Sequence, residues 1–365
     1  MPIYMDIHIV PGVKARGVAA AYQQDLLIEE DNKCKCMTYW VDEARETVFC
    51  LIEAPDKDAV KELHRKAHGL VPNKVIEVSS STVQSFLGRI YDPESAEMED
   101  GLKVFAEPSF RVLMLTYTDD PLVLAHRLGA EEAQRLLEIH NEAIRNSISL
   151  HGGTEAEQGG SGFVISFISA AKAVACSLAV LHTLDARQTE QLGFKISISG
   201  GEPVGKSTDL FGDTLLKGKH LASVTPVSGL IIANSIKQLL SKEKFANGQH
   251  VISLPAQDES LLECLFESLE QHWQQPDFDG EDYCHKMAMS KSQLYRKCVA
   301  LTGLSPNILL KDFRLEKAKS LLKKHQYSIS QVTFESGFTS PSYFTKCFKK
   351  KYGLLPIQYV EQCQA

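Results

Sequence analysis

The sequence has no long apolar run, no leader-like beginning and no even set of cysteines. No stretch of about eighteen consecutive apolar residues occurs, so we expect no transmembrane helix and no membrane partner. Residues 1–8 do not join a basic segment to an apolar one, so we expect no signal peptide. Nine cysteines, an odd number scattered over 365 residues, favour reduced thiols over a disulfide framework. These absences together predict a cytoplasmic protein.

Basic residues are outnumbered over most of the chain but are in excess in one segment. Residues 281–365 hold 14 Lys and Arg against 6 Asp and Glu, a local charge of +8. The rest holds 25 basic and 40 acidic residues, a charge of −15. A basic segment on an acidic protein indicates a polyanionic partner such as nucleic acid, and a solvated helical surface is the alternative. The length of the chain predicts two or three domains.

The first eighty residues have the pattern of a small α+β domain. Apolar residues alternate with Asp6 and His8 at the start, which is the period of a half-buried strand. A helical pattern over 14–30, two strand patterns around the acidic turn Asp42-Glu43, a second helix after Pro55 and a last strand follow. This order predicts a ferredoxin-like sandwich over residues 1–80.

The same domain contains side chains that suit a transition metal. His64 and His68 are four residues apart on one helix and therefore share a face. Asp6 and His8 share a face of the first strand, and Cys50 lies on another strand. Imidazole with thiolate or carboxylate suits Ni²⁺, Zn²⁺ or Cu²⁺. The expected ligands are His8, Glu43, Cys50, His64 and His68. The alternative is that both helical histidines are surface residues.

Three blocks carry a family resemblance in this region: "YMDIHIVPGV", "FCLIEAP" and "HRKAHGL". They resemble a family of small ferredoxin-like proteins described as nickel-binding, over residues 3–79. The resemblance implies a metal-sensing or ligand-sensing domain. Tyr22 stands where the family often has a histidine in its first helix, and Cys34 and Cys36 are additional to the pattern.

A connecting segment and a second α+β pattern follow. Serines at 79–81 and an acidic stretch at 92–100 predict a linker over residues 81–107 that carries short structure. The second α+β domain is expected over residues 108–240. Its segments "LAHRLG", "LLEIHNEAIRNSISLHGG" and "DLFGDTLLKGKHLA" resemble the class III nucleotide cyclase domain. The resemblance implies a βαββαβ core that dimerises.

The positions that carry cyclase chemistry are changed in this sequence. Cyclases hold Mg²⁺ with two aspartates because this ion needs hard oxygen ligands. Asp119 and Asp120 lie close to the first position, so a shifted alignment would supply one acid. We therefore expect a dimerisation scaffold and no enzyme, with a hollow that holds another ligand as the alternative. The aligned positions for the two aspartates, the transition-state Asn and Arg and the purine-selecting Lys are Tyr117, Ser161, Leu216, His220 and Glu157.

The C-terminal residues 259–365 have a helical pattern that repeats. Ser290 and Gln293 form a capping-box pattern before a helix whose buried stripe is Leu294, Cys298 and Leu301. A helix over about 306–325 follows. The arrangement then repeats, with a short helix over 328–335, a turn at Gly337 and a basic helix after Ser340-Pro341. Two helix-turn-helix units joined by one helix are predicted, each with a helix for the DNA major groove.

Two stretches of this domain carry a further resemblance: "MSKSQLYRKCVALTGLSPNILLKDFRLEKAKSLL" and "SISQVTFESGFTSPSYFTKCFKKKYGLLPIQYV". They resemble the AraC/XylS transcription regulators. The helix before Ser290 departs from that family at Gly280, Cys284 and His285. The resemblance, with the outward position of the lysines, implies DNA contacts from Ser292, Tyr295, Arg296, Ser342, Tyr343, Lys346, Lys349 and Lys350.

The whole chain is thus expected to be multidomain. Two α+β domains, ferredoxin-like and then cyclase-like, precede an all-α double helix-turn-helix domain. The predicted function is a sequence-specific DNA-binding transcription regulator whose first two domains sense and dimerise. Its expected partners are double-stranded DNA, a second copy of the chain and RNA polymerase. The alternatives are a nucleotide cyclase, or a metal-binding protein, with an appended DNA-binding domain.

Overall fold

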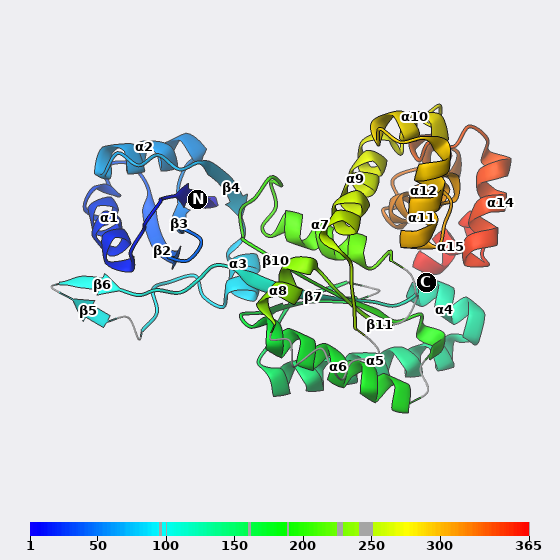
Figure 1. Cartoon of the computed structure of the whole chain (residues 1–365), viewed down its shortest axis with the longest axis horizontal. Helices are drawn as coiled ribbons and strands as arrows, with labels where there is room; N and C mark the ends of the chain where they lie inside the picture. The colour runs from blue at the N-terminus through cyan, green and yellow to red at the C-terminus, as the bar shows by residue number, and fades with distance from the viewer. Residues whose placement is uncertain are drawn as a thin grey trace.

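The computed structural model describes residues 1–94, 97–99, 101–159, 162–187, 190–224, 229–240 and 251–364. Figure 1 shows two α/β domains and a helical module. The N-terminal domain (blue) lies at one end, the middle domain (cyan to green) lies at the centre, and the C-terminal helices (yellow to red) pack on the middle domain. No described helix is long and apolar enough to cross a bilayer.

The N-terminal domain is a four-stranded antiparallel sheet covered by two helices. Its elements are β1 (Ile3–Ile9), α1 (Ala15–Ile28), β2 (Lys35–Asp42), β3 (Thr47–Glu53), α2 (Lys57–Ala67) and β4 (Lys74–Val78). The strand order is β2-β3-β1-β4, so β1 lies between β3 and β4. This is the βαββαβ arrangement predicted from the alternation pattern, and it places Asp6 in the middle of the sheet.

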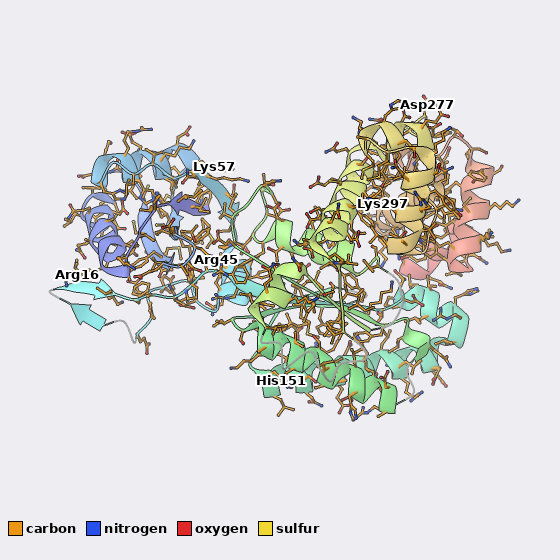
Figure 2. The ribbon with its side chains drawn as sticks, in the orientation of Figure 1. Arg16, Arg45, Lys57, His151, Asp277 and Lys297 are labelled. Carbon is orange, nitrogen blue, oxygen red and sulfur yellow. The ribbon has the colours of Figure 1, made fainter. Side chains whose placement is uncertain are left out.

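Both faces of this sheet are buried. Tyr4, Cys50 and Ile52 lie under the helices, in one core with Val18 and Leu63. The opposite face packs against the middle domain through a second core. At this junction, marked by Arg45 in Figure 2, the Arg45 guanidinium lies 3.9 Å from the centre of the Phe110 ring. The ammonium of Lys74 donates to three backbone carbonyls of residues 205–207. The first domain is therefore firmly attached to the second.

In its described residues, the segment expected to be a linker has regular structure, and its first part is packed. It contains α3 (Ser80–Leu87) and the hairpin β5 (Glu97–Glu99) and β6 (Leu102–Val104). Val83, Phe86 and Leu87 are buried, because their spacing puts them on one face of the helix. The buried guanidinium of Arg111 donates to the carbonyls of Phe86 and Leu87, which ties α3 to the middle domain.

The middle domain is a six-stranded sheet with the order β12-β11-β10-β7-β9-β8. Helices α5 and α6 cover one face, and α7 lies on the other (Figure 1). The sheet extends to residue 253, beyond the boundary expected at 240. Its elements are β7 (Arg111–Tyr117), α4 (Pro121–Leu128), α5 (Ala130–His151), β8 (Thr154–Gly159), β9 (Gly162–Phe167), α6 (Ala170–Ala186), β10 (Lys195–Gly201), α7 (Gly212–Leu221), β11 (Gly229–Ile232), α8 (Asn234–Leu239) and β12 (Val251–Ser253).

Four of these strands, β8-β9-β7-β10, have the same order as β2-β3-β1-β4 of the N-terminal sheet when each set is numbered along the chain. Strand β11 pairs parallel to β10, and β12 pairs parallel to β11. Gly218 of α7 lies so close to Leu115 of β7 that an added Cβ would be only 3.0 Å from the leucine side chain. Ser197 and Ser199 of β10 donate to backbone carbonyls of α7, which fixes this helix on the sheet.

The C-terminal module contains seven helices among the described residues. It consists of α9 (Ala256–His272), α10 (Gly280–Lys286), α11 (Lys291–Thr302), α12 (Pro306–Lys323), α13 (Ile329–Glu335), α14 (Pro341–Tyr352) and α15 (Pro356–Gln364). The α10–α11 and α13–α14 pairs are the two helix-turn-helix units, and α12 joins them. Their second helices, α11 and α14, both end at a left-handed glycine, with φ +71° at Gly303 and +80° at Gly353.

Each helix-turn-helix unit is attached to the middle domain. The core of the middle domain continues into α9, α10 and α11 of the first unit. For the second unit, the buried carboxylate of Asp120 accepts hydrogen bonds from Lys323 Nζ at 2.8 Å and Tyr359 Oη at 3.0 Å. Burial disfavours the charged form of Asp120, but these partners outweigh burial and lower its pKa. The ionised carboxylate thus holds α12 and α15 against the start of α4.

Candidate DNA-binding helices and metal centre

Helix α11 presents one apolar and one polar face, as its sequence predicted. The Ser290 side chain accepts from the backbone N–H of Gln293, and the Gln293 side chain accepts from that of Ser290, so the capping box is formed. Leu294 and Cys298 are buried against α10 and α12. Tyr295 is 55% exposed, although it is aromatic. Ser292 and Arg296 are exposed beside it. A large aromatic side chain held out in solvent by a rigid helix is available to a partner.

Helix α14 repeats this arrangement with more positive charge. Phe344 and Phe348 are fully buried, while Tyr343 is 54% exposed. Ser342, Lys346, Lys349 and Lys350 are exposed as well. Among the described residues, none of these three lysines has a carboxylate partner, whereas the neighbouring Lys351 pairs with Asp312 and Glu316. The outer face of α14 therefore keeps three unneutralised cations, which suits a phosphate backbone.

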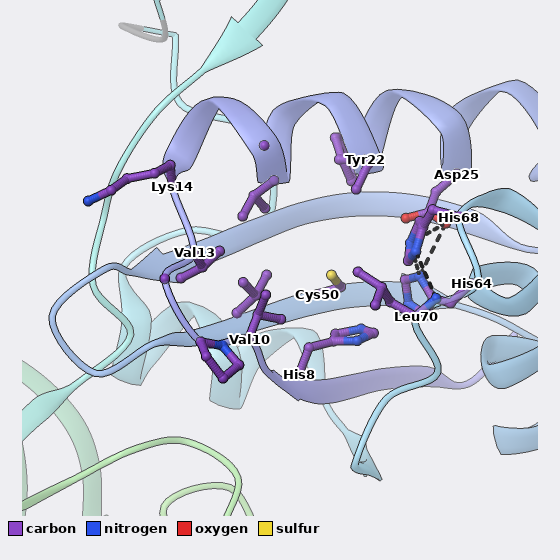
Figure 3. A pocket seen from close by; sticks show the side chains of 16 residues that line it. His8, Val10, Val13, Lys14, Tyr22, Asp25, Cys50, His64, His68 and Leu70 are labelled. Atoms are coloured by element: carbon purple, nitrogen blue, oxygen red, sulfur yellow. Dashed lines mark hydrogen bonds and ion pairs between the residues drawn. The ribbon is translucent and has the colours of Figure 1, made fainter.

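A cluster of ionisable side chains lies between the N-terminal sheet and its helices (Figure 3). His64 of α2 is at its centre. Its Nε2 lies 2.9 Å from Oδ2 of Asp6 on β1, and its Nδ1 lies 3.1 Å from Oδ1 of Asp25 on α1. His68 approaches the second side, with Nε2 3.2 Å from His64 Nδ1. On the first side, His8 Nε2 lies 3.4 Å from Asp6 Oδ1.

The electrostatics of this cluster follow from its burial. His64 is 1% exposed, Asp6 is fully buried and Asp25 is 2% exposed. Burial disfavours the His64 cation, but Asp6 and Asp25 outweigh burial and raise its pKa to about 10. The pKa of Asp6 is lowered in turn, because His64 and His8 outweigh the effect of burial. Without a metal, an imidazolium therefore bridges two carboxylates, with a proton on each nitrogen.

The same atoms have the spacing and chemistry of a metal site. Asp6, His8, Cys50 and His64 each offer one ligand atom, and these atoms lie within 4.8 Å of one another. Asp25, His64 and His68 form a second such group. Imidazole, thiolate and carboxylate together suit Ni²⁺, Zn²⁺ or Cu²⁺, so the residues present fit a transition metal. A cation held by one ring nitrogen of His64 would take the place of the proton on that nitrogen.

A cavity of about 270 Å³ leads to this cluster. Val10 and Val13 line one end of the cavity, Leu70 and His68 lie beside His64 at the other end, and Cys50 lies between the two ends (Figure 3). Ligand exchange at a buried centre needs such an opening. The surrounding apolar side chains also limit water around the ligands, which strengthens electrostatic interactions inside.

Comparison with known proteins identifies the two ends of the chain. Residues 283–362 match the family model described as "Helix-turn-helix domain". The C-terminal module is an AraC-type helix-turn-helix domain. Residues 4–78 match the family model described as "Nickel responsive protein SCO4226-like". The two resemblances predicted from the sequence motifs are thereby confirmed for these residue ranges.

Individual relatives cover only parts of the chain. The HTH-type transcriptional regulator MtrA of Neisseria gonorrhoeae is 41% identical over 71 residues, which are 20% of this chain and 24% of MtrA. SCO4226 of Streptomyces coelicolor A3(2) is 32% identical, over 21% of this chain and 94% of that one, with a TM-score of 0.20. The DNA-binding domain of AdpA, solved with a target DNA, is 30% identical over 28% and 90%, with a TM-score of 0.27. The chain spans less than half the length of the curated relatives it matches.

The nickel-responsive-type domain brings together four of its five predicted ligands. His8, Cys50 and His64 lie in one ligand group and His68 joins His64 in the other, but Glu43 is in neither. The Glu43 carboxylate instead accepts from Lys14 Nζ at 2.8 Å and from the backbone N–H of Ala15 at 2.9 Å. The prediction for Glu43 was therefore wrong. The turn containing Glu43 lies at the N-terminus of α1, where free backbone N–H groups attract a carboxylate.

Sequence reasoning missed Asp25, the second carboxylate of the centre. Val18, Tyr22 and Asp25 are at i, i+4 and i+7 of α1, and all three are buried. An acidic residue on an apolar helix face is the signal that could have found it. Tyr22 lies at the wall of the cavity and packs on Tyr39, with ring centres 5.1 Å apart. Cys34 and Cys36 are buried thiols outside both ligand groups.

The structure also places the positions that the resemblance to cyclases would assign to catalysis. Ser161 lies outside the described residues. Tyr117 is half-buried at the end of β7, and Glu157 is exposed on β8. The two acids that a shifted alignment would use are already engaged: Asp119 pairs with Arg127 at 2.9 Å, and Asp120 pairs with Lys323. The AraC-type module thus uses one of these acids as a structural attachment point.

Proposed function

We propose that this protein is a sequence-specific DNA-binding transcription regulator with sensing and dimerisation functions in its first two domains. The observation that carries the proposal is the pair of exposed helices, α11 and α14, in the AraC-type module. Each is capped at its start, ended by a glycine and buried along one face, so its outer side chains are held rigidly. A helix of this kind fits the DNA major groove, and two of them joined by α12 can read two groove segments.

Binding of the full chain to double-stranded DNA fragments tests this function. We expect the purified protein to prefer fragments from upstream of its own and neighbouring genes over random DNA of equal length. Affinity should fall steeply between low and physiological salt, because contacts with phosphates release counterions. A gel-shift or anisotropy titration at several salt concentrations measures both effects. Equal affinity for native and random fragments would remove the main support for a regulator.

We further propose that the N-terminal domain senses a divalent transition metal, Ni²⁺, Zn²⁺ or Cu²⁺. His64, His8, Cys50 and Asp6 would hold the ion, and Asp25 and His68 would orient the His64 ring through its other nitrogen. The support is that the ligand atoms of Asp6, His8, Cys50 and His64 all lie within 4.8 Å of one another. A metal-storage function is the alternative. A single tight equivalent per chain favours sensing, whereas several equivalents favour storage.

Metal binding should be accompanied by proton release and should weaken as the pH falls. A histidine ligand must be neutral, while the two carboxylates raise the pKa of His64 to about 10. At pH 7 the ion must therefore displace at least one proton, so affinity should drop about tenfold or more for each unit of pH decrease. Calorimetry in two buffers with different ionisation enthalpies measures the proton count. An affinity independent of pH between 6 and 8 would contradict a role for His64 as a ligand.

For the middle domain we propose a cyclase-like scaffold that supports dimerisation and has no catalytic activity. The engaged acids Asp119 and Asp120 and the changed position Tyr117 support this proposal. We expect no cyclic nucleotide from ATP or GTP with Mg²⁺ or Mn²⁺, as measured by chromatography of the products. Product formation that disappears in an Asp119→Ala chain, and persists in an Asp185→Ala chain, would show instead that Asp119 binds a catalytic ion.

The assembly and location follow as parts of the same proposal. A homodimer in the cytoplasm would join two DNA-binding modules, which raises the effective concentration of the second module once the first has bound. A regulator of this kind would also contact RNA polymerase. Light scattering of the full chain at micromolar concentration measures the oligomeric state, and a monomer mass would exclude the dimer.

A further inference from the structure

A cavity of about 680 Å³ lies where the middle domain meets both helix-turn-helix units. Lys195 of β10 and residues of α7 form one side. The turn after α11, with Leu304, and one face of α12 form the other, and Lys351 of α14 reaches the same space. The cavity is of the size that binds small organic molecules in proteins. The cavity is lined by the middle domain and by both helix-turn-helix units. The relative positions of these three parts set the distance between α11 and α14.

An aromatic wall forms one boundary of this cavity. The ring of His220 is stacked on Phe266, with centroids 4.7 Å apart and planes at 16°. Phe313 of α12 continues the wall, 6.2 Å from Phe266. His220 is 5% exposed, and its Nδ1 has no hydrogen-bond partner among the described residues. Burial, with Lys219 and Lys317, lowers the pKa of His220 to about 4, so the ring is neutral and suits a flat, apolar partner.

The middle-domain side of the cavity has unneutralised positive charge. Lys195 and Lys219 line it, and neither has a carboxylate within ion-pair distance in the described parts of the chain. Among the described residues, the half-buried ammonium of Lys195 donates only to the carbonyl of Ala222, at 3.0 Å. An ammonium that is partly removed from water, with one neutral acceptor, has free donors for an anion.

The acidic residues on the opposite side do not neutralise these cations. Glu270 pairs with Lys317 at 2.6 Å, and Glu316 pairs with Lys319 at 3.0 Å. Asp312 pairs with Lys351 at 3.4 Å. Each acid of the lining thus already has its own lysine. The charge left over in the cavity is positive and lies on Lys195 and Lys219, next to the aromatic wall.

We propose that this cavity binds a small organic anion with a planar ring, such as an aromatic carboxylate or a nucleoside monophosphate. The ring packs on His220, Phe266 and Phe313, and the anionic group accepts hydrogen bonds from Lys195 and Lys219. The site lies away from the metal centre of the first domain. Its regulatory consequence rests on the proposed function: because the ligand contacts α12 and approaches Lys351, occupancy changes the DNA affinity of the module.

Calorimetry on the full chain tests the site with two pairs of probes. The first pair is 2-naphthoate and its neutral analogue 2-naphthamide, and the second is AMP and adenosine. We expect one anion of the two pairs to bind at least about tenfold more tightly than its neutral partner, because charge-assisted hydrogen bonds are the strong ones. The pair whose anion binds shows whether the ligand is an aromatic carboxylate or a nucleoside monophosphate. If neither anion binds at millimolar concentration, the proposal is wrong.

Variants assign the binding to this cavity. Lys195→Gln removes one cation, and we expect about tenfold weaker binding of the anion and little change for the neutral analogue. Lys237→Gln is the matched control, because Lys237 is exposed on α8 and does not line the cavity. Ser223→Trp places a large ring in the cavity and should abolish binding, with folding checked by circular dichroism. Equal affinities for the Lys195→Gln and Lys237→Gln chains would overturn the assignment.

The outcome is separable from the proposed function. DNA binding is measured on the same chains without any probe. If the protein binds the anion but no DNA, the cavity proposal is supported and the regulator proposal is contradicted. If the protein binds DNA but neither anion, the regulator proposal is supported and the cavity proposal is contradicted.

Discussion

Replacing Arg296 and Lys346 together by alanine should weaken binding to the preferred DNA about 30-fold or more at fixed salt. One side chain extends from α11 and the other from α14, and both are exposed and without an ion-pair partner in the described chain. A direct base contact is worth about 1–3 kcal/mol, and residues on separate helices with no shared partner contribute nearly independently. Fluorescence anisotropy with the preferred and random fragments measures the loss for each single variant and for the pair.

Two controls separate reading of bases from attraction to phosphate. Lys349→Ala should weaken all sequences alike and reduce the slope of log affinity against log salt by about 1. Lys237→Ala, on the exposed side of α8, should change neither quantity. If the double variant keeps its preference for the specific fragment, α11 and α14 do not read its sequence through these side chains.

Replacing His64 by alanine should abolish high-affinity metal binding and destabilise the metal-free N-terminal domain by about 3–5 kcal/mol. The loss of stability arises because Asp6 and Asp25, both buried, would lose the cation between them. Trp40 is buried in this domain, and the only other tryptophan of the chain is Trp273. In a Trp273→Phe background, Trp40 fluorescence during urea unfolding reports the N-terminal domain together with its junction to the middle domain, and calorimetry measures metal affinity.

His182→Ala is the matched control for His64→Ala, because His182 is exposed on α6 and far from both ligand groups. It should leave stability and metal affinity unchanged. His68→Ala keeps the Asp6–His64–Asp25 contacts, so it distinguishes loss of a ligand from loss of the fold. Full metal affinity in a folded His64→Ala chain would place the site elsewhere. A coupling of about 1–3 kcal/mol between metal and DNA binding is expected of a sensor, and an undetectable coupling would remove the sensing role.

The C-terminal helices were predictable because their signals are local. Each signal acts within a few residues of the chain. The signals are the capping box of Ser290 and Gln293, the glycines at 303 and 353, and the apolar spacing of Phe344 and Phe348. The backbone conformation that a cap or a left-handed turn requires is decided by the residues at that turn. Exposed positions such as Tyr295 followed from the same periodicity. The succession of strands and helices along the N-terminal domain was predictable for the same reason, since alternation and turn residues are visible in short windows.

The metal centre was only partly predictable because it combines three elements. The shared face of His64 and His68 follows from helix geometry, but the approach of Asp25 depends on how α1 crosses α2. Glu43 failed as a ligand for the same reason: only packing decides that its turn meets the start of α1 and not the cluster. Asp120 likewise gained its role from a contact with Lys323, more than two hundred residues further along the chain.

The sequence by itself determined the kinds of module at the two ends of this protein and the exposed polar side of α11 and α14, because caps, periodicity and charge act over one or two turns of chain. Tertiary structure alone decided that Val83, Phe86 and Leu87 are buried, that Asp25 completes the centre around His64, and that Lys195 and His220 border one cavity with α12. Each of these depends on the burial of surfaces that are distant in sequence. Such contacts form only where shape and apolar area match, and no short window of residues contains that information.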